Sequence, residues 1–400
     1  MTSGPLRDLV VLDFGQLLAG PFATTLLADF GATTIKIERP GKGDSLRDFG
    51  PSGVEGPIWW RSINRNKKSL ALDWKRPESR QILERLIRRA DVMVENFRAG
   101  VLESNGLGPD ILHQWNPRLI LLRVSGYGQS GPYRKRPGFG KAAEAFSGFC
   151  HLTGFPDRAP VFPGFPMADM TTGLMGAYSI MMAVHARDQG LANGQVIDLP
   201  IYETMLRLID YHIPVRTGTD LVPNRNGNSQ PPSAGLSGVE KSRDGRWIGY
   251  AASSYAVAKR LLSLVGGSDW ADQARFGSLV DICSHAREIE EAVSKWMAER
   301  TAEEVVSAFE TAEAVAIRVY DTDDILSDPH IAARNNVIGV EGMTTKFVNV
   351  VPRMSETPGK FQWPGDVHVG AGGAQVMRDL LGFDDAEIKA FEKCGAIELP

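Results

Sequence analysis

Short β-rich runs alternate with helical stretches over the first part of the chain, and this pattern limits it to few folds. The strand-like runs cover residues 9–14, 33–38, 69–73, 92–97 and 119–125. Helical patterns fill two of the intervals, at 20–28 and 77–90. Strand, helix and strand repeated in this way need right-handed crossovers, so the sequence predicts an α/β fold with a Rossmann-like parallel sheet.

The rest of the chain divides the predicted fold into two domains. A strand at 195–200 and a helix at 201–211 continue the large domain, which is predicted to take in residues 1–213 and 325–400. Residues 214–232 are rich in Gly, Asn, Arg and Pro, which is typical of a linker. Residues 233–324 predict a smaller α+β domain. A final amphipathic helix near 374–381 is expected to pack back on the first sheet.

Charge and composition exclude several classes of partner. A formal net charge of -4 and a pI near 6.0 give no general basic surface for nucleic acid or an anionic membrane. The start of the chain has no signal-peptide pattern, and the apolar stretch 170–186 is short and mixed, which predicts a buried helix. Cys150, Cys283 and Cys394 are far apart, which argues against disulfides and a metal site and favours a cytoplasmic protein.

Basic and polar residues follow several of the predicted strands. Arg39 ends the second strand, Leu72 and Lys75 lie at the end of the third, and the fourth ends in Asn96, Phe97 and Arg98. Ligands collect at the carboxyl ends of parallel strands, so these residues predict one phosphate-binding rim. Taken one at a time, each charge is more typical of a solvated loop.

The loop at 126–131 matches the dinucleotide motif G-x-G-x-x-G, but its context does not fit. That motif requires a helix to begin at once after the first strand. Here Pro132 and Pro137 follow, and the loop comes after the fifth predicted strand. We therefore interpret the match as a glycine-rich turn.

One aspartate stands at the start of the predicted buried helix. A Pro- and Gly-rich loop over 155–166 leads to Asp169. The residues alone favour a helix N-cap here, because an Asp before a helix accepts a backbone N–H. A nucleophile is the alternative, and the two roles are compatible.

Several short segments in fixed order carry a family resemblance. They are LDF at 12–14, AGPFAT at 19–24, LADFGA at 27–32, IKIERPG at 35–41, NRNKKS at 64–69, VENFR at 94–98 and GYGQSGP at 126–132. Together they resemble the class III CoA-transferases, the CaiB/BaiF family, which includes formyl-CoA and carnitine CoA-transferases and the α-methylacyl-CoA racemases. The resemblance covers nearly the whole chain.

The resemblance implies an enzyme that moves CoA from an acyl-CoA donor to a carboxylic acid. The catalytic aspartate of the family falls on Asp169, which would form a mixed anhydride and then an aspartyl-CoA thioester. CoA is a substrate and no permanently bound cofactor or metal is expected. The family fold is a ring-like chain, two of which interlock as a homodimer. The residues expected to bind CoA are Arg39, Leu72, Lys75, Asn96, Phe97, Arg98 and Arg136.

Several residues of the related enzymes are absent from this sequence, and their absence bears on which reaction is expected. The racemases use a histidine where this chain has Phe139 or Gly140, and racemisation needs two acid/base groups, so transfer is favoured. The formyl-CoA enzymes carry a glutamate near Gly140 and a glutamine near Leu18, and both are absent here. The usual C-terminal histidine is replaced around 370–373.

Three alternatives stay open at this point. They are an acyl-CoA racemase or epimerase of the same fold, a non-catalytic CoA-binding protein, and a nucleotide-dependent oxidoreductase on the same sheet. The residues do not identify the donor and acceptor acids. Residues 233–238 are candidates for recognising the acid. Dicarboxylates such as succinate are plausible donors only because other members of the family commonly use them.

Overall fold

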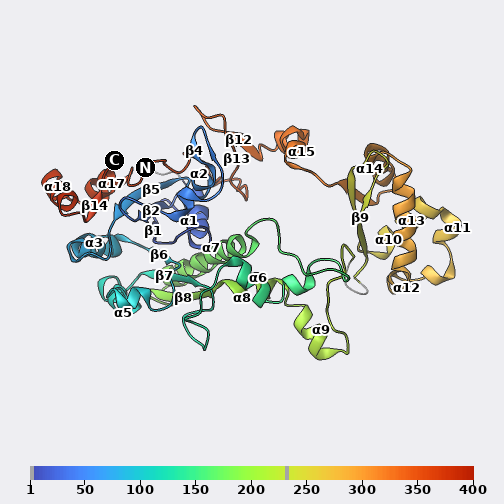
Figure 1. Ribbon diagram of the computed structural model, residues 1–400, viewed down its shortest axis with the longest axis horizontal. Helices are drawn as coiled ribbons and strands as arrows, with labels where there is room; N and C mark the ends of the chain where they lie inside the picture. Colours follow the sequence, from blue (N-terminus) through green and yellow to red (C-terminus); the bar gives the residue numbers. More distant parts are fainter. Residues whose placement is uncertain (1–3, 230–233) are drawn as a thin grey trace. The chain divides into compact units, whose positions relative to one another are not determined.

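The computed structural model describes residues 4–229 and 234–400 (Figure 1). Contacts divide the chain into two compact units. The first comprises Met1–Phe149, Phe162–Pro214 and Arg334–Pro400, and the second comprises Cys150–Val161 and Val215–Ala333. The domain boundaries drawn from the sequence stay a prediction, and they differ from this grouping mainly at residues 150–161 and 325–333.

A seven-stranded sheet forms the centre of the first unit. Its strands are β1 (Val10–Asp13), β2 (Thr33–Glu38), β5 (Lys67–Leu72), β6 (Val92–Glu95), β7 (Ile120–Ser125), β8 (Gln195–Pro200) and β14 (Ile397–Glu398). The order across the sheet is β14-β5-β2-β1-β6-β7-β8, and all neighbours are parallel except β14 and β5. The predicted α/β fold with a parallel sheet is confirmed.

The strand order reverses direction between β1 and β6. From β1 the chain builds outward through β2 and β5 on one side, and through β6, β7 and β8 on the other. The loops that follow β1 and β6 therefore diverge and leave a crevice at the carboxyl ends of these strands. Residues 14–18 and 96–99 lie at the edges of this crevice.

Helices cover both faces of the sheet. In the first unit they are α1 (Ala19–Asp29), α2 (Ile58–Ile63), α3 (Arg80–Arg89), α4 (Val101–Ser104), α5 (Pro109–Trp115), α6 (Gly140–Phe146), α7 (Met167–Asp188), α8 (Ile201–Leu208), α17 (Gly373–Gln375) and α18 (Asp385–Lys393). Strand residues alternate between the two faces. Val11 packs with α1, α6, α7 and α8, whereas its neighbour Leu12 packs with α3, α5 and the C-terminal helices.

The C-terminal segment packs on the first sheet and adds an edge strand to it. β14 pairs antiparallel with β5 through Ile397 and Leu72, which brings the end of the chain against a strand from its first part. The helical segment predicted near 374–381 is present, as the short α17 followed directly by a π-helix over Val376–Leu380. Helix α18 and the antiparallel edge strand were missed.

Helix α7 contains the apolar stretch and lies against α1. A Cβ atom at Gly173 would lie 2.7 Å from the ring of Phe22, so only glycine allows this close approach. The helix predicted to be buried is buried on one side only, because Leu174, Tyr178 and Met182 are about half exposed on the other side. No helix within the described residues is long and apolar enough to cross a membrane.

Shorter elements complete the two units. Two antiparallel pairs in the first unit are β3 (Ser52–Gly53) with β4 (Gly56–Pro57) and β12 (Val337–Gly339) with β13 (Lys346–Val348). The second unit has a three-stranded antiparallel sheet of β9 (Leu236–Lys241), β10 (Trp247–Ala252) and β11 (Val315–Arg318). Its helices are α10 (Tyr255–Gly266), α11 (Ser268–Ala271), α12 (Leu279–Ser284), α13 (Ala286–Ala298), α14 (Ala302–Thr311), α15 (Thr322–Ser327) and α16 (Pro329–Ala333). Helix α9 (His212–Gly218) occupies the first part of the predicted linker.

Candidate active site

Two pockets open at the carboxyl ends of the central strands in the first unit. The rim pocket has a volume of about 860 Å³ and lies beyond β1, β2, β5 and β6. The aspartate pocket is smaller, about 160 Å³, and includes Asp169. Gln16 and Phe97 line both, so the two pockets adjoin at the crevice between β1 and β6.

The predicted site residues fall into two groups. Arg39, Leu72 and Lys75 line the rim pocket. Asn96, Arg98, Arg136 and Asp169 line the aspartate pocket, and Phe97 lines both. The predicted CoA contacts span about a hundred positions of the sequence, and the fold brings them together around one crevice.

Asp169 lies in the first turn of α7 but does not cap it. The N-cap position is Pro166, and no side chain of that residue caps the helix, so the N-cap interpretation is wrong. None of the described residues donates a hydrogen bond to the carboxylate of Asp169. Burial raises the pKa of Asp169 to about 6, the negative charge of Glu144 adds to this, and Lys141 opposes it.

The carboxylate of Asp169 rests against the start of α6. A Cβ atom built on Gly140 would lie 2.3 Å from Oδ2 of Asp169, well inside any normal contact. Glycine at this position therefore makes the space that the carboxylate occupies.

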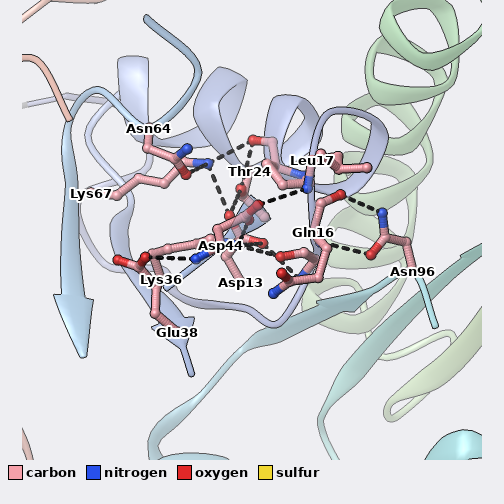
Figure 2. A network of polar contacts seen from close by, with 12 residues as sticks. Asp13, Gln16, Leu17, Thr24, Lys36, Glu38, Asp44, Asn64, Lys67 and Asn96 are labelled. Atoms are coloured by element: carbon pink, nitrogen blue, oxygen red, sulfur yellow. Dashed lines mark hydrogen bonds and ion pairs between the residues drawn. The ribbon is translucent and has the colours of Figure 1, made fainter. Parts of the chain in front are cut away.

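A buried ionic network underlies the crevice (Figure 2). Asp13, at the end of β1, accepts from Lys67 Nζ at 2.9 Å and lies 3.8 Å from Lys36 Nζ. Burial alone would raise the pKa of Asp13, but the two ammonium groups hold it below its ordinary value. Burial lowers the pKa of Lys67 to about 8 despite this partner. Lys36 also pairs with Asp44 at 2.8 Å, and all four side chains are fully buried.

The network and Asn96 fix the turn between β1 and α1. Leu17 has a φ of +61°, a left-handed conformation that costs a residue with a Cβ about 1–2 kcal/mol. The N–H of Leu17 donates to Asp44 Oδ1 at 3.0 Å. The N–H of Gln16 donates to Asn96 Oδ1 at 2.7 Å, and Asn96 Nδ2 donates to the carbonyl oxygen of Gln16 at 2.8 Å (Figure 2). The turn is held in place before any ligand enters.

Two of the predicted CoA contacts, Asn96 and Leu72, have structural roles in the fold. Both polar groups of the Asn96 side chain are used by the main chain of Gln16, so Asn96 holds the turn. Leu72 is fully buried in the hydrophobic core, where β5 meets β14. Arg39, Lys75, Arg98 and Arg136 are exposed and remain available to a ligand.

An aromatic wall in the rim pocket was missed by sequence reasoning. The ring centroid of Trp74 lies 5.3 Å from that of Phe97 and 6.2 Å from that of Phe14. Lys75 Nζ lies 5.4 Å from the centroid of Trp74, so a cation borders the wall. The sequence feature that could have predicted this wall is Trp74 itself, which directly precedes Lys75.

The remaining candidate segments are not among the described residues that line the two pockets. Residue 233 is outside the described residues, and 236–238 belong to β9 in the second unit. Gly370 donates its N–H to Ser69 Oγ at 2.7 Å, which ties the segment 370–373 to β5. A structural role therefore accounts for Gly370.

Comparisons with known proteins show which family the chain belongs to. The chain matches CoA-transferase family III over residues 6–368. It is 39% identical over 388 residues to succinyl-CoA–D-citramalate CoA-transferase of Chloroflexus aurantiacus, with 96% of each chain covered. It is 37% identical over 393 residues to the beta subunit of succinyl-CoA–L-malate CoA-transferase of the same organism, with 97% of this chain and 96% of that one covered.

A solved structure agrees as well. The crystal structure of a CaiB/BaiF family protein from Brucella suis is similar with a TM-score of 0.83 and 26% sequence identity, covering 95% of this chain and 100% of that chain. The resemblance drawn from the sequence is confirmed. The chain belongs to CoA-transferase family III and is a CoA-transferase.

Proposed function

We propose that Asp169 is the nucleophile that carries the acyl group and then CoA during transfer between two carboxylic acids. One observation carries this proposal: a half-buried carboxylate without a hydrogen-bond partner among the described residues lies in a pocket that adjoins the larger rim pocket. An ion-paired carboxylate would be a poor nucleophile, whereas a raised pKa accompanies a more basic oxygen.

Each step of the proposed reaction exchanges one anion for another. An oxygen of Asp169 attacks the thioester carbonyl, the C–S bond breaks, and CoA thiolate leaves a mixed anhydride. The thiolate then attacks the aspartyl carbonyl, the anhydride C–O bond breaks, and the donor acid leaves as a carboxylate. The acceptor carboxylate reverses the two steps and regenerates Asp169. No proton is gained or lost, so a site without a histidine suffices.

CoA is proposed to bind with its nucleotide in the rim pocket and its thioester in the aspartate pocket. Arg39 and Lys75 are exposed on the rim and suit the phosphates. Trp74 and Phe97 supply an aromatic surface on which an adenine ring can stack. The shared position of Phe97 makes the path from one pocket to the other continuous.

Small dicarboxylic acids are the proposed donor and acceptor. The two Chloroflexus relatives are named for succinyl-CoA with citramalate or malate, all of them dicarboxylic. Arg98, Arg134 and Arg136 line the aspartate pocket, and none of them forms an ion pair within the described residues. Three unpaired cations beside the nucleophile suit a substrate that keeps one free carboxylate after the other is esterified.

A homodimer is proposed from the exposed face of α7. Leu174, Tyr178 and Met182 recur at every fourth residue, so they lie on one side of the helix, and each is about half exposed. An apolar face of this kind marks an interface between chains, and a second copy of the chain is the proposed partner.

The test combines exchange with covalent trapping. The protein is incubated with succinyl-CoA and a panel of acids, new CoA esters are measured by mass spectrometry, and the quenched protein is digested to find the modified residue. Asp169→Asn should abolish exchange and labelling, while Asp157→Asn, an exposed aspartate, should leave both intact. Exchange that persists in Asp169→Asn rejects the mechanism.

The same experiment decides against the alternatives. A racemase would convert a chiral acyl-CoA without a free acid, and a CoA-binding protein would bind the ester unchanged. No histidine is among the described residues that line the aspartate pocket, so the base that racemisation needs is not supplied there.

A further inference from the structure

An ion pair on α6, of which only the carboxylate is buried, lies against the start of α7. Glu144 is fully buried, and its Oε2 accepts from Lys141 Nζ at 3.0 Å. Its Oε1 accepts from the main-chain N–H of Ala168 at 3.3 Å. Ala168 directly precedes Asp169, so one buried carboxylate reaches the helical turn that carries the proposed nucleophile.

This contact replaces a cap that α7 lacks. The first four N–H groups of a helix have no partner within it, and a side chain at the N-cap usually accepts one of them. The N-cap residue of α7 is Pro166, which has no side-chain acceptor. Glu144 therefore supplies from α6 what the local sequence does not, and its charge suits a helix N-terminus.

Lys141 extends the attachment to the loop before α7. Its Nζ donates to the carbonyl oxygens of Pro163 at 2.8 Å and Phe165 at 3.2 Å. The lysine side chain is about half exposed, whereas its partner Glu144 is not. The pair ties both the loop and the first turn of α7 to α6, whose first residue is in contact with Asp169.

We propose that Glu144 is a positioning residue for the reaction at Asp169, which holds the first turn of α7 and sets the electrostatic field at the nucleophile. The inference rests on the role proposed for Asp169. Glu144 does not touch the substrate in this role. It acts through the helix turn and through its charge.

The charged groups around Asp169 give the sign of the electrostatic effect. Glu144 and Lys141 face it from α6, and three arginines, at positions 98, 134 and 136, line the same pocket. Repulsion by Glu144 adds to burial in raising the pKa of Asp169. Glu144→Gln removes the charge and keeps a carbonyl oxygen for the N–H of Ala168. Asp169 should then ionise at lower pH.

A titration without substrate tests this sign. The carboxyl carbons of aspartate are labelled, the signal of Asp169 is assigned by its loss in Asp169→Asn, and its chemical shift is followed from pH 4 to pH 8, a range of about four units around the expected midpoint. In Glu144→Gln the midpoint should lie below that of the wild type. Glu310→Gln, the same change at an exposed position of α14, should leave it in place.

Kinetics test the positioning role. Glu144→Met has a similar length but no acceptor, so kcat should fall about tenfold with KM for the acyl-CoA within about twofold. An unmoved midpoint in Glu144→Gln or an unchanged kcat in Glu144→Met overturns the inference. Should Glu144→Met fail to fold, the titration decides alone. Because it needs no turnover, the titration also separates failure of this inference from failure of the proposed reaction.

Discussion

The variant Gly140→Ala tests whether the position of the Asp169 carboxylate determines the rate of the reaction at Asp169. The added Cβ would lie 2.3 Å from Oδ2 and 3.1 Å from Cγ of Asp169. Ordinary contact needs a separation of about 3.4 Å, so the carboxylate must move by about 1 Å. A displacement of that size can cost about a hundredfold in rate, which is about 2.7 kcal/mol of activation free energy.

The stability of this variant should change little. Gly140 does not have a positive φ, so its backbone suits alanine, and it lies at the start of a helix. We expect the free energy of unfolding to stay within about 1 kcal/mol of the wild type. Gly218→Ala is the control, because a Cβ there meets nothing within 4 Å.

The assay is the rate of adduct formation in a single turnover with succinyl-CoA. Quenched samples are digested, and the labelled peptide that contains residue 169 is measured by mass spectrometry. Gly140→Ala should form the adduct about a hundredfold more slowly, and Gly218→Ala at the wild-type rate. A folded Gly140→Ala enzyme that reacts at the wild-type rate refutes the link between this contact and catalysis.

Three further predictions concern charge and assembly. The pKa of Asp169 is raised from 3.8 to about 6, so the folded state binds this proton more tightly than the unfolded state does, and stability is lost as the pH rises through that window. Asp169→Asn should therefore raise the Tm at pH 8 and not at pH 4; equal changes at both would contradict this. Lys67→Met removes the ammonium group that donates to Asp13 in a fully buried site and should lower the free energy of unfolding by about 3–5 kcal/mol in chemical denaturation. Arg76→Met, which breaks an exposed ion pair, should lower it by less than about 1 kcal/mol, and similar losses in the two variants would count against the network. Tyr178→Glu puts a charge on the exposed face of α7 and should give a monomer in light scattering, so a dimer that persists would exclude this face.

The sheet was predictable because its signal is local and repeated. The strands at 33–38 and 195–200 match β2 and β8, since each is a compact β-rich run with clear ends. The edge strand β14 has two residues, which is too short for any periodicity. Helix α18 did carry a local signal, a capping box between Asp384 and Glu387, and it was missed.

The candidate site was predictable only in part. Asp169 came from the family resemblance, because the residues around it favoured an N-cap. The rim residues followed from their places at strand ends. The roles of Gly140 and Glu144 could not be predicted from strand ends. Both residues belong to α6 and contact α7 only because the two helices pack together, and the residues in contact are about 24 positions or more apart in the chain.

The strand order also bears on the oxidoreductase alternative. The parallel strands have the order of a dinucleotide-binding fold, in which a glycine-rich first turn lets a pyrophosphate approach the N-terminus of the first helix. Here that turn contains Leu17 in a left-handed conformation, and the N–H groups of Gln16 and Leu17 already donate to Asn96 and Asp44. A phosphate at this turn would have to displace two partly buried hydrogen bonds. The way this turn is held therefore supports the proposal that phosphates bind to the charged side chains that border the rim pocket.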